Sequence, residues 1–110
     1  MPNFSKNEIV LVGYPFSDLS GVKVRPAVVL NASHISQDML IVLLTCKTAG
    51  LLAGEFVLLE WGKSGLNIET AVKRGIYTIN HSLVRKRLGR LDNLDAKRLE
   101  QSLKEWLGML

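Results

Sequence analysis

Short apolar runs, separated by glycine, proline and small polar residues, make up most of the chain. Five of these runs are rich in β-branched or alternating apolar residues and predict strands: 8–14, 26–30, 39–45, 55–60 and 87–91. The second and third are apolar enough to be buried on both faces of a sheet. Segment 71–80 predicts a strand pair, or one strand bent around Gly75.

A helical period replaces this pattern at the end of the chain. Asp92 is a good N-cap, and Asp95 follows in a capping-box-like position at the favourable end of the helix dipole. One face of the predicted helix is apolar: Ala96, Leu99, Leu103, Trp106, Leu107 and Leu110. We therefore expect a helix over about 93–108 that packs against the strands or against a second subunit. A single helical turn is expected at 82–85.

About six short strands followed by one helix predict a mainly β fold. Such strands most simply form a small, strongly curved barrel over about 6–91, with the helix after it. A chain of 110 residues is long enough for one hydrophobic core and too short for two. The prediction is a single domain over 1–110.

Composition narrows the class of protein. Hydrophobic residues make up 47% and charged residues 22% of the chain, a balance typical of globular proteins rather than disordered ones. The only cysteine, Cys46, excludes an internal disulfide and favours the cytoplasm. The N-terminal stretch has no apolar signal-peptide core, and the longest apolar run, 39–44, is too short to span a membrane. We expect a soluble cytoplasmic protein with no membrane contact.

The net charge of +4 is unevenly distributed along the chain. Segment 73–98 holds eight of the fourteen basic residues and only two acidic ones, so it carries +6 while the remainder carries −2. A concentrated positive field suits a polyanion-binding surface. A solubilising face is an equally common use of such a cluster.

Metal and nucleophile motifs are largely missing from the sequence. The two histidines lie far apart and Cys46 has no partner cysteine, which disfavours a zinc site. No cluster of carboxylates has metal-ligand spacing, and the glycines at 62–65 are too close together for a phosphate-binding loop. His81 is expected to begin or cap the short helical turn, and His34 lies in a polar loop. We expect no metal and no cofactor.

The segment 13–30, Gly-Tyr-Pro-Phe-Ser-Asp-Leu-Ser-Gly-Val-Lys-Val-Arg-Pro-Ala-Val-Val-Leu, resembles the signature of the MazF/PemK toxin family. The shared features are a strand, a proline-aromatic step, a loop with Ser-Gly, and Arg-Pro before an apolar strand. Two later stretches fit in order: 39–45 as a strand ending in threonine, and 70–91 as a strand, a short turn and a strand. The resemblance covers nearly the whole chain.

The resemblance implies a fold and an activity. The fold is the SH3-like small β-barrel of the CcdB/MazF/PemK toxins, usually a homodimer. The activity is that of a type II toxin, a sequence-specific endoribonuclease that cuts single-stranded RNA without a metal and leaves 2′,3′-cyclic phosphate and 5′-OH ends. The implied partners are single-stranded RNA and a cognate antitoxin whose C-terminal segment covers the active site.

By position, the family's catalytic arginine and threonine fall on Arg25 and Thr45. A guanidinium offers a planar fork of donors suited to phosphate but keeps its proton, so Arg25 is expected to stabilise charge rather than act as a base. Thr45 is expected to hydrogen-bond a phosphate oxygen; Cys46 and Lys47 follow it, where the family commonly has Ser or Ala and a polar residue. The candidates for substrate binding are Phe16, Ser20, Gly21, Lys23, Lys47 and Arg74.

Other interpretations remain open at this stage. An arginine near a strand start is commonly a surface ion-pair residue, and Thr45 has a strand propensity of its own. The same barrel serves CcdB-like gyrase poisons, and this chain ends Glu-Trp-Leu-Gly-Met-Leu, although Trp106 fits the apolar stripe of the helix more simply. A non-catalytic RNA- or protein-binding SH3-like module is the third possibility.

Overall fold

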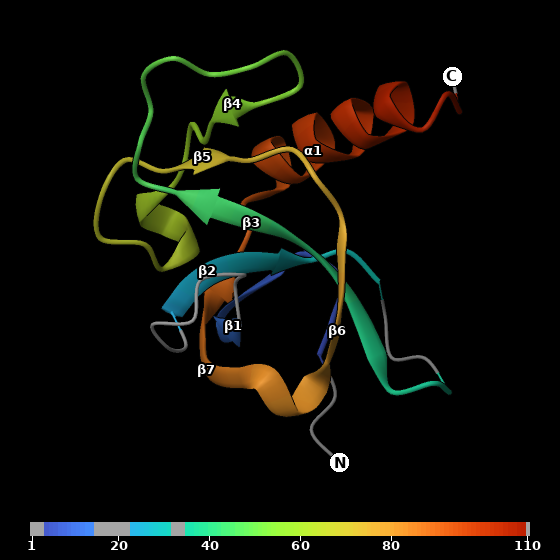
Figure 1. Ribbon diagram of the computed structural model, residues 1–110. Helices are drawn as coiled ribbons and strands as arrows, with labels where there is room; N and C mark the ends of the chain where they lie inside the picture. The colour runs from blue at the N-terminus through green and yellow to red at the C-terminus, as the bar shows by residue number, and fades with distance from the viewer. Residues whose placement is uncertain (1–3, 15–22, 32–34, 110) are drawn as a thin grey trace.

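The structure is a computed structural model that describes residues 4–14, 23–31 and 35–109. Strands dominate this part of the chain and one α-helix ends it (Figure 1). The elements in chain order are β1 (Glu8–Tyr14), β2 (Lys23–Val29), β3 (Asp38–Thr45), β4 (Phe56–Val57), η1 (Gly62–Ser64), β5 (Ala71–Val72), β6 (Tyr77–Asn80), η2 (His81–Leu83), β7 (Val84–Arg90) and α1 (Asn93–Trp106). The mainly β class with a C-terminal helix is confirmed.

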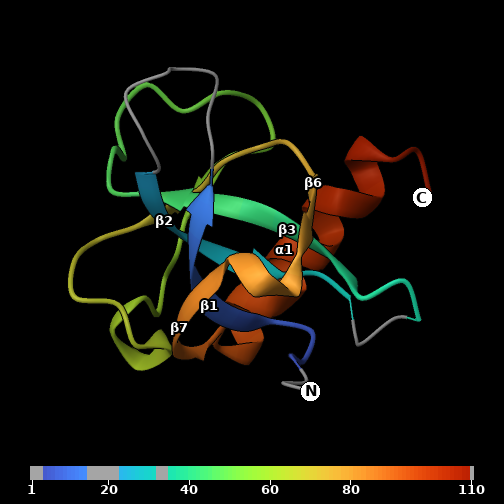
Figure 2. The ribbon, with the colours of Figure 1, turned by 60° about the horizontal axis from the view of Figure 1, so that its bottom comes forward.

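The strands form one antiparallel, strongly curved sheet in the order β4-β5-β3-β2-β1-β7. The first half of β3 also pairs with β6, and the 3-10 turn η2 joins β6 to β7 on the side of the molecule away from α1 (Figures 1 and 2). Within the described residues, hydrogen bonds do not close the sheet into a complete barrel. The curvature of the expected barrel is present, but β4, β6 and β7 each pair with one strand only and remain as edges.

The central strands are buried on both faces along most of their length, as the uninterrupted apolar runs at 26–30 and 39–45 predicted for β2 and β3. Alternate side chains of each strand point to opposite faces. One face encloses an inner cluster: Phe4, Val10, Val12, Ala27, Val29, Met39, Ile41, Leu43 and Ile79. The other face packs against α1 through a second cluster: Ile9, Val28, Val42, Leu44, Leu58, Val72, Leu91 and Leu99.

The strand predicted at 55–60 is much shorter in the structure. Only Phe56–Val57 pair with β5. The Leu58 N–H still donates to the Thr70 carbonyl oxygen at 2.9 Å, but those of Leu59 and Glu60 donate to the Asp95 carboxylate, at 2.9 and 2.8 Å. A contact with the distant helix therefore ends this strand.

Helix α1 begins where the sequence predicted. The Asp92 carboxylate accepts the Leu94 N–H at 3.1 Å, and the helix ends at Trp106, two residues before the predicted end. Leu99 is buried, whereas Trp106 and Leu107 are 53% and 54% exposed, so only the first half of the apolar stripe packs on the sheet. No helix of the described chain is long and apolar enough to cross a membrane.

The bend predicted in 71–80 is confirmed. Gly75 has φ +114° and separates β5 from β6. The turn after β6 is also present, and the Asn80 side chain caps it by accepting the Ser82 N–H at 2.9 Å. Strand β7 then begins at Val84, three residues before the predicted start.

Candidate functional site

A cleft of about 230 Å³ opens where β2 and β3 stop pairing. The last residues paired between these strands are Ala27 and Leu43. Pro26, which has no backbone N–H, lies at the point where pairing ends. If the register continued, it would bring Arg25 opposite Thr45. The cleft is lined by residues 11, 24–26, 44–46, 65–68, 70 and 88.

Arg25 and Thr45, twenty positions apart in the sequence, thus line the same cleft. Arg25 pairs with Val12 of β1, and its side chain is exposed. The Thr45 Oγ1 accepts the Lys47 N–H at 3.1 Å, which holds the hydroxyl in place. Because a hydroxyl carries its own donor as well, Thr45 can still donate a hydrogen bond into the cleft.

The outer wall of the cleft is the segment after η1. Gly65 of this segment lies against β7, so close that a Cβ on Gly65 would collide with the Leu88 carbonyl oxygen. A Cβ on Gly89 would equally collide with the Ser64 carbonyl oxygen. Two glycines facing each other therefore allow this wall to approach the strands.

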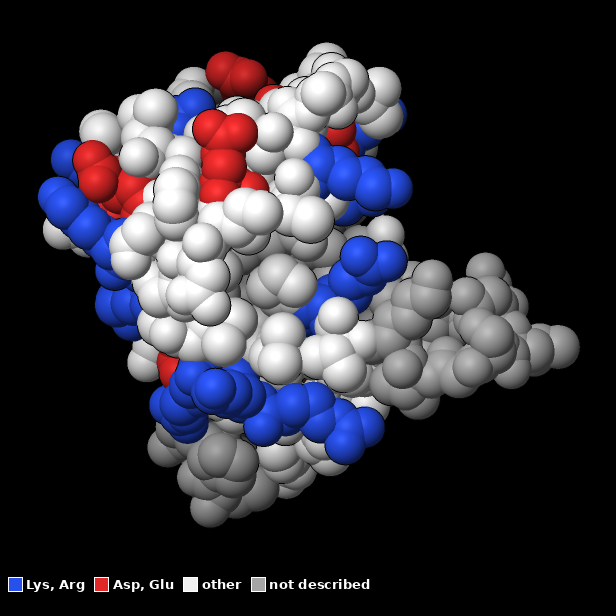
Figure 3. All heavy atoms as spheres, turned by 90° about the vertical axis from the view of Figure 1, so that its left-hand side faces the viewer, with Lys and Arg blue, Asp and Glu red and all other residues white. Residues whose placement is uncertain are grey.

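Basic side chains gather on the face of the molecule that carries the cleft. The start of β2, the end of β3 and the segment after η1 lie on one side in Figure 1, and this side faces the viewer in Figure 3. Figure 3 shows Lys and Arg along the lower part of this face and beside the grey residues, and both acidic and basic side chains in its upper part. Among the described residues, no three His, Cys, Asp or Glu side chains gather as they would around a metal ion.

Of the other candidates near the cleft, Lys23 and Lys47 lie in the described part of the chain. Lys47 is exposed just beyond the cleft and takes part through its backbone N–H. Lys23 opens β2, but its side chain lies outside the description. The remaining loop candidates lie outside the described residues: Phe16, Ser20, Gly21 and His34.

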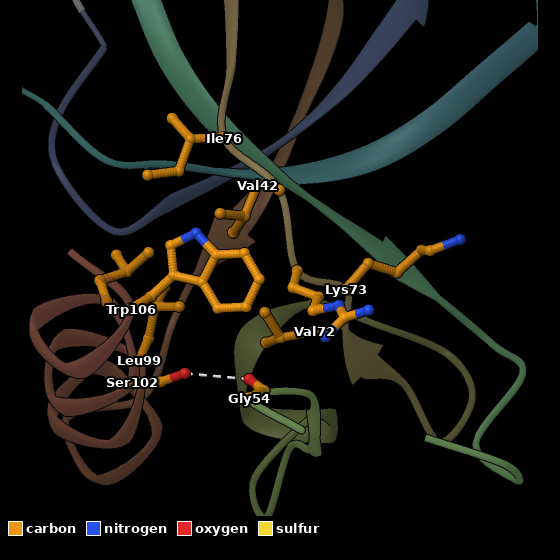
Figure 4. Close-up of a pocket in the computed structure, with 11 residues that line it drawn as sticks. Val42, Gly54, Val72, Lys73, Ile76, Leu99, Ser102 and Trp106 are labelled. Atoms are coloured by element: carbon orange, nitrogen blue, oxygen red, sulfur yellow. Dashed lines mark hydrogen bonds between the residues drawn. The ribbon is translucent and has the colours of Figure 1, made fainter. Parts of the chain in front are cut away.

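Arg74 lies in a second hollow that shares no lining residue with the cleft. Its guanidinium lies 5.4 Å from the ring centre of Trp106, a cation–π distance. Figure 4 shows the Trp106 ring reaching from α1 over this hollow, and nearby the Ser102 hydroxyl donates to the Gly54 carbonyl oxygen at 2.9 Å.

The backbone around this second hollow is held by Glu55. Its carboxylate accepts the N–H groups of Leu52 and Arg74, at 2.8 and 3.1 Å. These two hydrogen bonds hold the pKa of Glu55 below its ordinary value. Arg74 is therefore positioned for this hollow and not for the cleft.

The comparisons agree with this architecture. The family model described as "PemK-like, MazF-like toxin of type II toxin-antitoxin system" matches residues 5–107. The chain belongs to this family. The match confirms the resemblance drawn from the Arg-Pro segment and the two later stretches. None of the curated proteins matches the chain.

Solved structures of this toxin family share the fold. MazF from Deinococcus radiodurans has a TM-score of 0.77 at 17% identity, with 99% of this chain and 100% of that chain covered. An endoribonuclease from a mycobacterial species has a TM-score of 0.75 at 17% identity, with 99% and 95% covered. A mycobacterial endoribonuclease in complex with its cognate antitoxin has a TM-score of 0.71 at 17% identity, with 100% and 98% covered.

In this PemK/MazF-like chain, the Arg-Pro step and the strand-ending threonine meet at one cleft. Sequence reasoning did not identify the wall of the cleft, formed by 65–68 and Leu88. The glycines around η1 were visible as a turn signal, but nothing local indicates that Gly65 contacts Gly89 of a distant strand. Cys46, which was not a candidate site residue, also lines the cleft.

Proposed function

We propose that this protein is the toxin of a type II toxin–antitoxin system and that it cuts single-stranded RNA in the cleft between Arg25 and Thr45. One observation carries the proposal: the two residues expected to hold a phosphate line a single basic-flanked cleft. Membership of the PemK/MazF-like family supports it.

The proposed reaction uses the 2′-OH of the substrate as the nucleophile, so the protein has to hold the phosphate in line and stabilise its charge. The 2′ oxygen loses its proton and bonds to the adjacent phosphorus. The bond from phosphorus to the 5′ oxygen breaks, and that oxygen takes up a proton. The products are a 2′,3′-cyclic phosphate and a 5′-OH, and no step needs a metal ion.

Arg25 is assigned to the non-bridging phosphate oxygens. Its guanidinium stays charged and presents parallel N–H donors that match a phosphate, so it stabilises the charge that grows in the transition state. Thr45 is assigned to a second phosphate oxygen, because its hydroxyl is oriented by the Lys47 N–H and keeps a donor free.

The remaining candidates are proposed to bind the RNA chain away from this phosphate: Phe16, Ser20, Gly21, Lys23 and Lys47 near the cleft, and Arg74 at the second hollow. The cognate partner is proposed to be an antitoxin that covers the cleft, and the working form a homodimer. One neighbour, the mycobacterial endoribonuclease, is in complex with its cognate antitoxin. MazF from D. radiodurans is also in complex with MazE.

Cleavage of RNA by the purified protein in EDTA tests the proposal. Wild type is expected to cut and to leave cyclic-phosphate ends, measured by mass spectrometry of the products. Arg25→Ala is expected to lower kcat/KM by about 100- to 1,000-fold, as the loss of one oxyanion donor does elsewhere. Thr45→Val, which keeps the shape and removes the donor, is expected to act in the same direction.

Lys97→Ala is the matched control, because it removes one exposed positive charge from α1 without touching the cleft. Equal cleavage by wild type and Arg25→Ala would show that Arg25 takes no part in the reaction. Loss of wild-type cleavage in EDTA would discard the metal-free route. Inhibition of DNA gyrase without RNA cleavage would favour a CcdB-like poison, and RNA binding without cleavage a non-catalytic module.

A further inference from the structure

Arg85 is an exposed arginine of β7 whose guanidinium lies close to Gly13 in β1. A Cβ on Gly13 would be 2.7 Å from the Arg85 Nε and 3.1 Å from Nη2. Two other arginines of the described chain are paired with carboxylates: Arg87 with Glu8 at 3.0 Å and Arg98 with Asp95 at 2.9 Å. Within the same described residues, no carboxylate lies within ion-pair distance of Arg85.

An irregularity of the sheet directs Arg85 to this position. Leu11 pairs with Lys86 and Val12 with Val84, so Arg85 is the extra residue between two paired positions. Such a bulge bends the strand and re-aims one side chain. The position of Arg85 is therefore built into the pairing of β1 with β7.

The guanidinium of Arg85 lies against Gly13, and residues next to Gly13 in the sheet line the cleft. Gly13 is two residues beyond Leu11, on the same face of β1, and it pairs with Val24. Both Leu11 and Val24 line the cleft. The donors of Arg85 are thus next to the cleft, on its β1 side, and no described acidic group neutralises them.

We propose that Arg85 binds a backbone phosphate of the RNA next to the one that is cut, and that Gly13 is needed because only a residue without a side chain lets the guanidinium lie there. This inference rests on the proposed function, since it names a contact with the same substrate. The planar guanidinium of an arginine can donate two parallel hydrogen bonds to a phosphate. Contacts with phosphates that are not cut position the RNA and do not select its bases.

Binding of a 2′-O-methyl RNA, which has no free 2′-OH and cannot be cut, tests the contact separately from cleavage. Arg85→Ala is expected to weaken binding about ten-fold, the effect of one hydrogen-bonded charge. It should also make the slope of log K against log salt shallower by about 0.7, the value for one phosphate on a single strand. Arg85→Lys should keep the slope and recover part of the affinity.

Gly13→Ala provides the sharper variant, because it displaces the guanidinium without removing its charge. The clashing atoms are the end of a flexible side chain, so the protein is expected to stay folded, as checked by thermal unfolding. Gly13→Ala should weaken binding, and the double variant should bind no more weakly than Arg85→Ala alone, since both changes remove one contact. Arg90→Ala, at the other end of β7, is the control for the loss of one positive charge.

Cleavage of normal RNA separates this inference from the proposed function. With Arg85→Ala, KM should rise while kcat stays within about two-fold of the wild-type value, because the contact is equally strong in the bound substrate and in the transition state. If wild type cleaves but Arg85→Ala and Gly13→Ala bind and cleave like Arg90→Ala, the inference fails and the function stands. If wild type binds RNA in an Arg85-dependent way but does not cleave, the function fails and the inference stands.

Discussion

Asp95 shows how far the role of a single residue can differ from its local pattern. Its position in the first turn of α1 predicted a dipole and capping role. In the structure its side chain is fully buried and accepts hydrogen bonds from two backbone N–H groups before η1 and from Arg98. Arg98 in turn donates to the Val57 carbonyl oxygen at 2.9 Å and lies over the Phe56 ring. This pair fastens the helix to β4.

Asp95→Ala is therefore expected to lower the free energy of unfolding by about 3 kcal/mol or more, because it leaves buried donors and an ionised partner without their acceptor. Asp92→Ala, which removes only an exposed N-cap bond, is expected to cost about 1 kcal/mol. Urea unfolding of the two variants compares them directly. Equal losses would mean that the buried carboxylate contributes no more than an ordinary cap.

At the scale of elements, the contact between η1 and β7 decides the shape of the cleft. Gly65, with φ +88°, and Gly89 face each other at a distance that admits no Cβ on either. The wall at 65–68 follows directly from this contact. A change that separates these two backbones should therefore affect both stability and the cleft.

Gly89→Ala is expected to destabilise the protein by about 1–3 kcal/mol, the usual cost of overpacking, because its Cβ meets a backbone oxygen that cannot rotate away. Cleavage should fall as well, since the wall moves outward. Gly62→Ala, which has open space around its Cβ, is the control and should change stability little. Urea unfolding and an RNA cleavage assay measure the two effects. Unchanged stability and cleavage in Gly89→Ala would contradict the assigned role of the contact.

On the scale of the whole molecule, the basic segment of the sequence does not become one surface. Lys73 and Arg74 lie by the hollow under Trp106, the cations of β7 lie along an edge strand, and two more lie on α1. Two of the eight are paired with Glu8 and Asp95. The positive charge that reaches the cleft is thus smaller than the count along the chain suggests.

Arg74→Ala tests how far along the surface RNA is held. Because Arg74 lies in a hollow separate from the cleft, cleavage of a short RNA that spans only the cleft should be unchanged. A long RNA that reaches the second hollow should bind up to about ten-fold more weakly, the effect of one lost charged contact. Fluorescence anisotropy with both RNAs measures this. Equal loss with the short RNA would mean that the two hollows act as one site.

The sequence alone determined the features that depend on neighbouring residues. Strand periodicity identified β1 and β3. A glycine within segment 71–80 predicted the bend at Gly75, and the Asp92 cap marked the start of α1. The Arg-Pro segment indicated the family, which the match over 5–107 then showed. These signals are local because backbone conformation and side-chain alternation are set within a few residues.

Tertiary structure decided what depends on residues far apart in the chain. Strand β4 is short because the N–H groups of Leu59 and Glu60 bind a helix carboxylate, and the cleft has a wall because two distant glycines touch. Pairing between β2 and β3 brings Arg25 and Thr45 into one cleft, and a bulge between β1 and β7 aims Arg85 beside it. Strand register and the close packing of backbones determine which distant side chains meet.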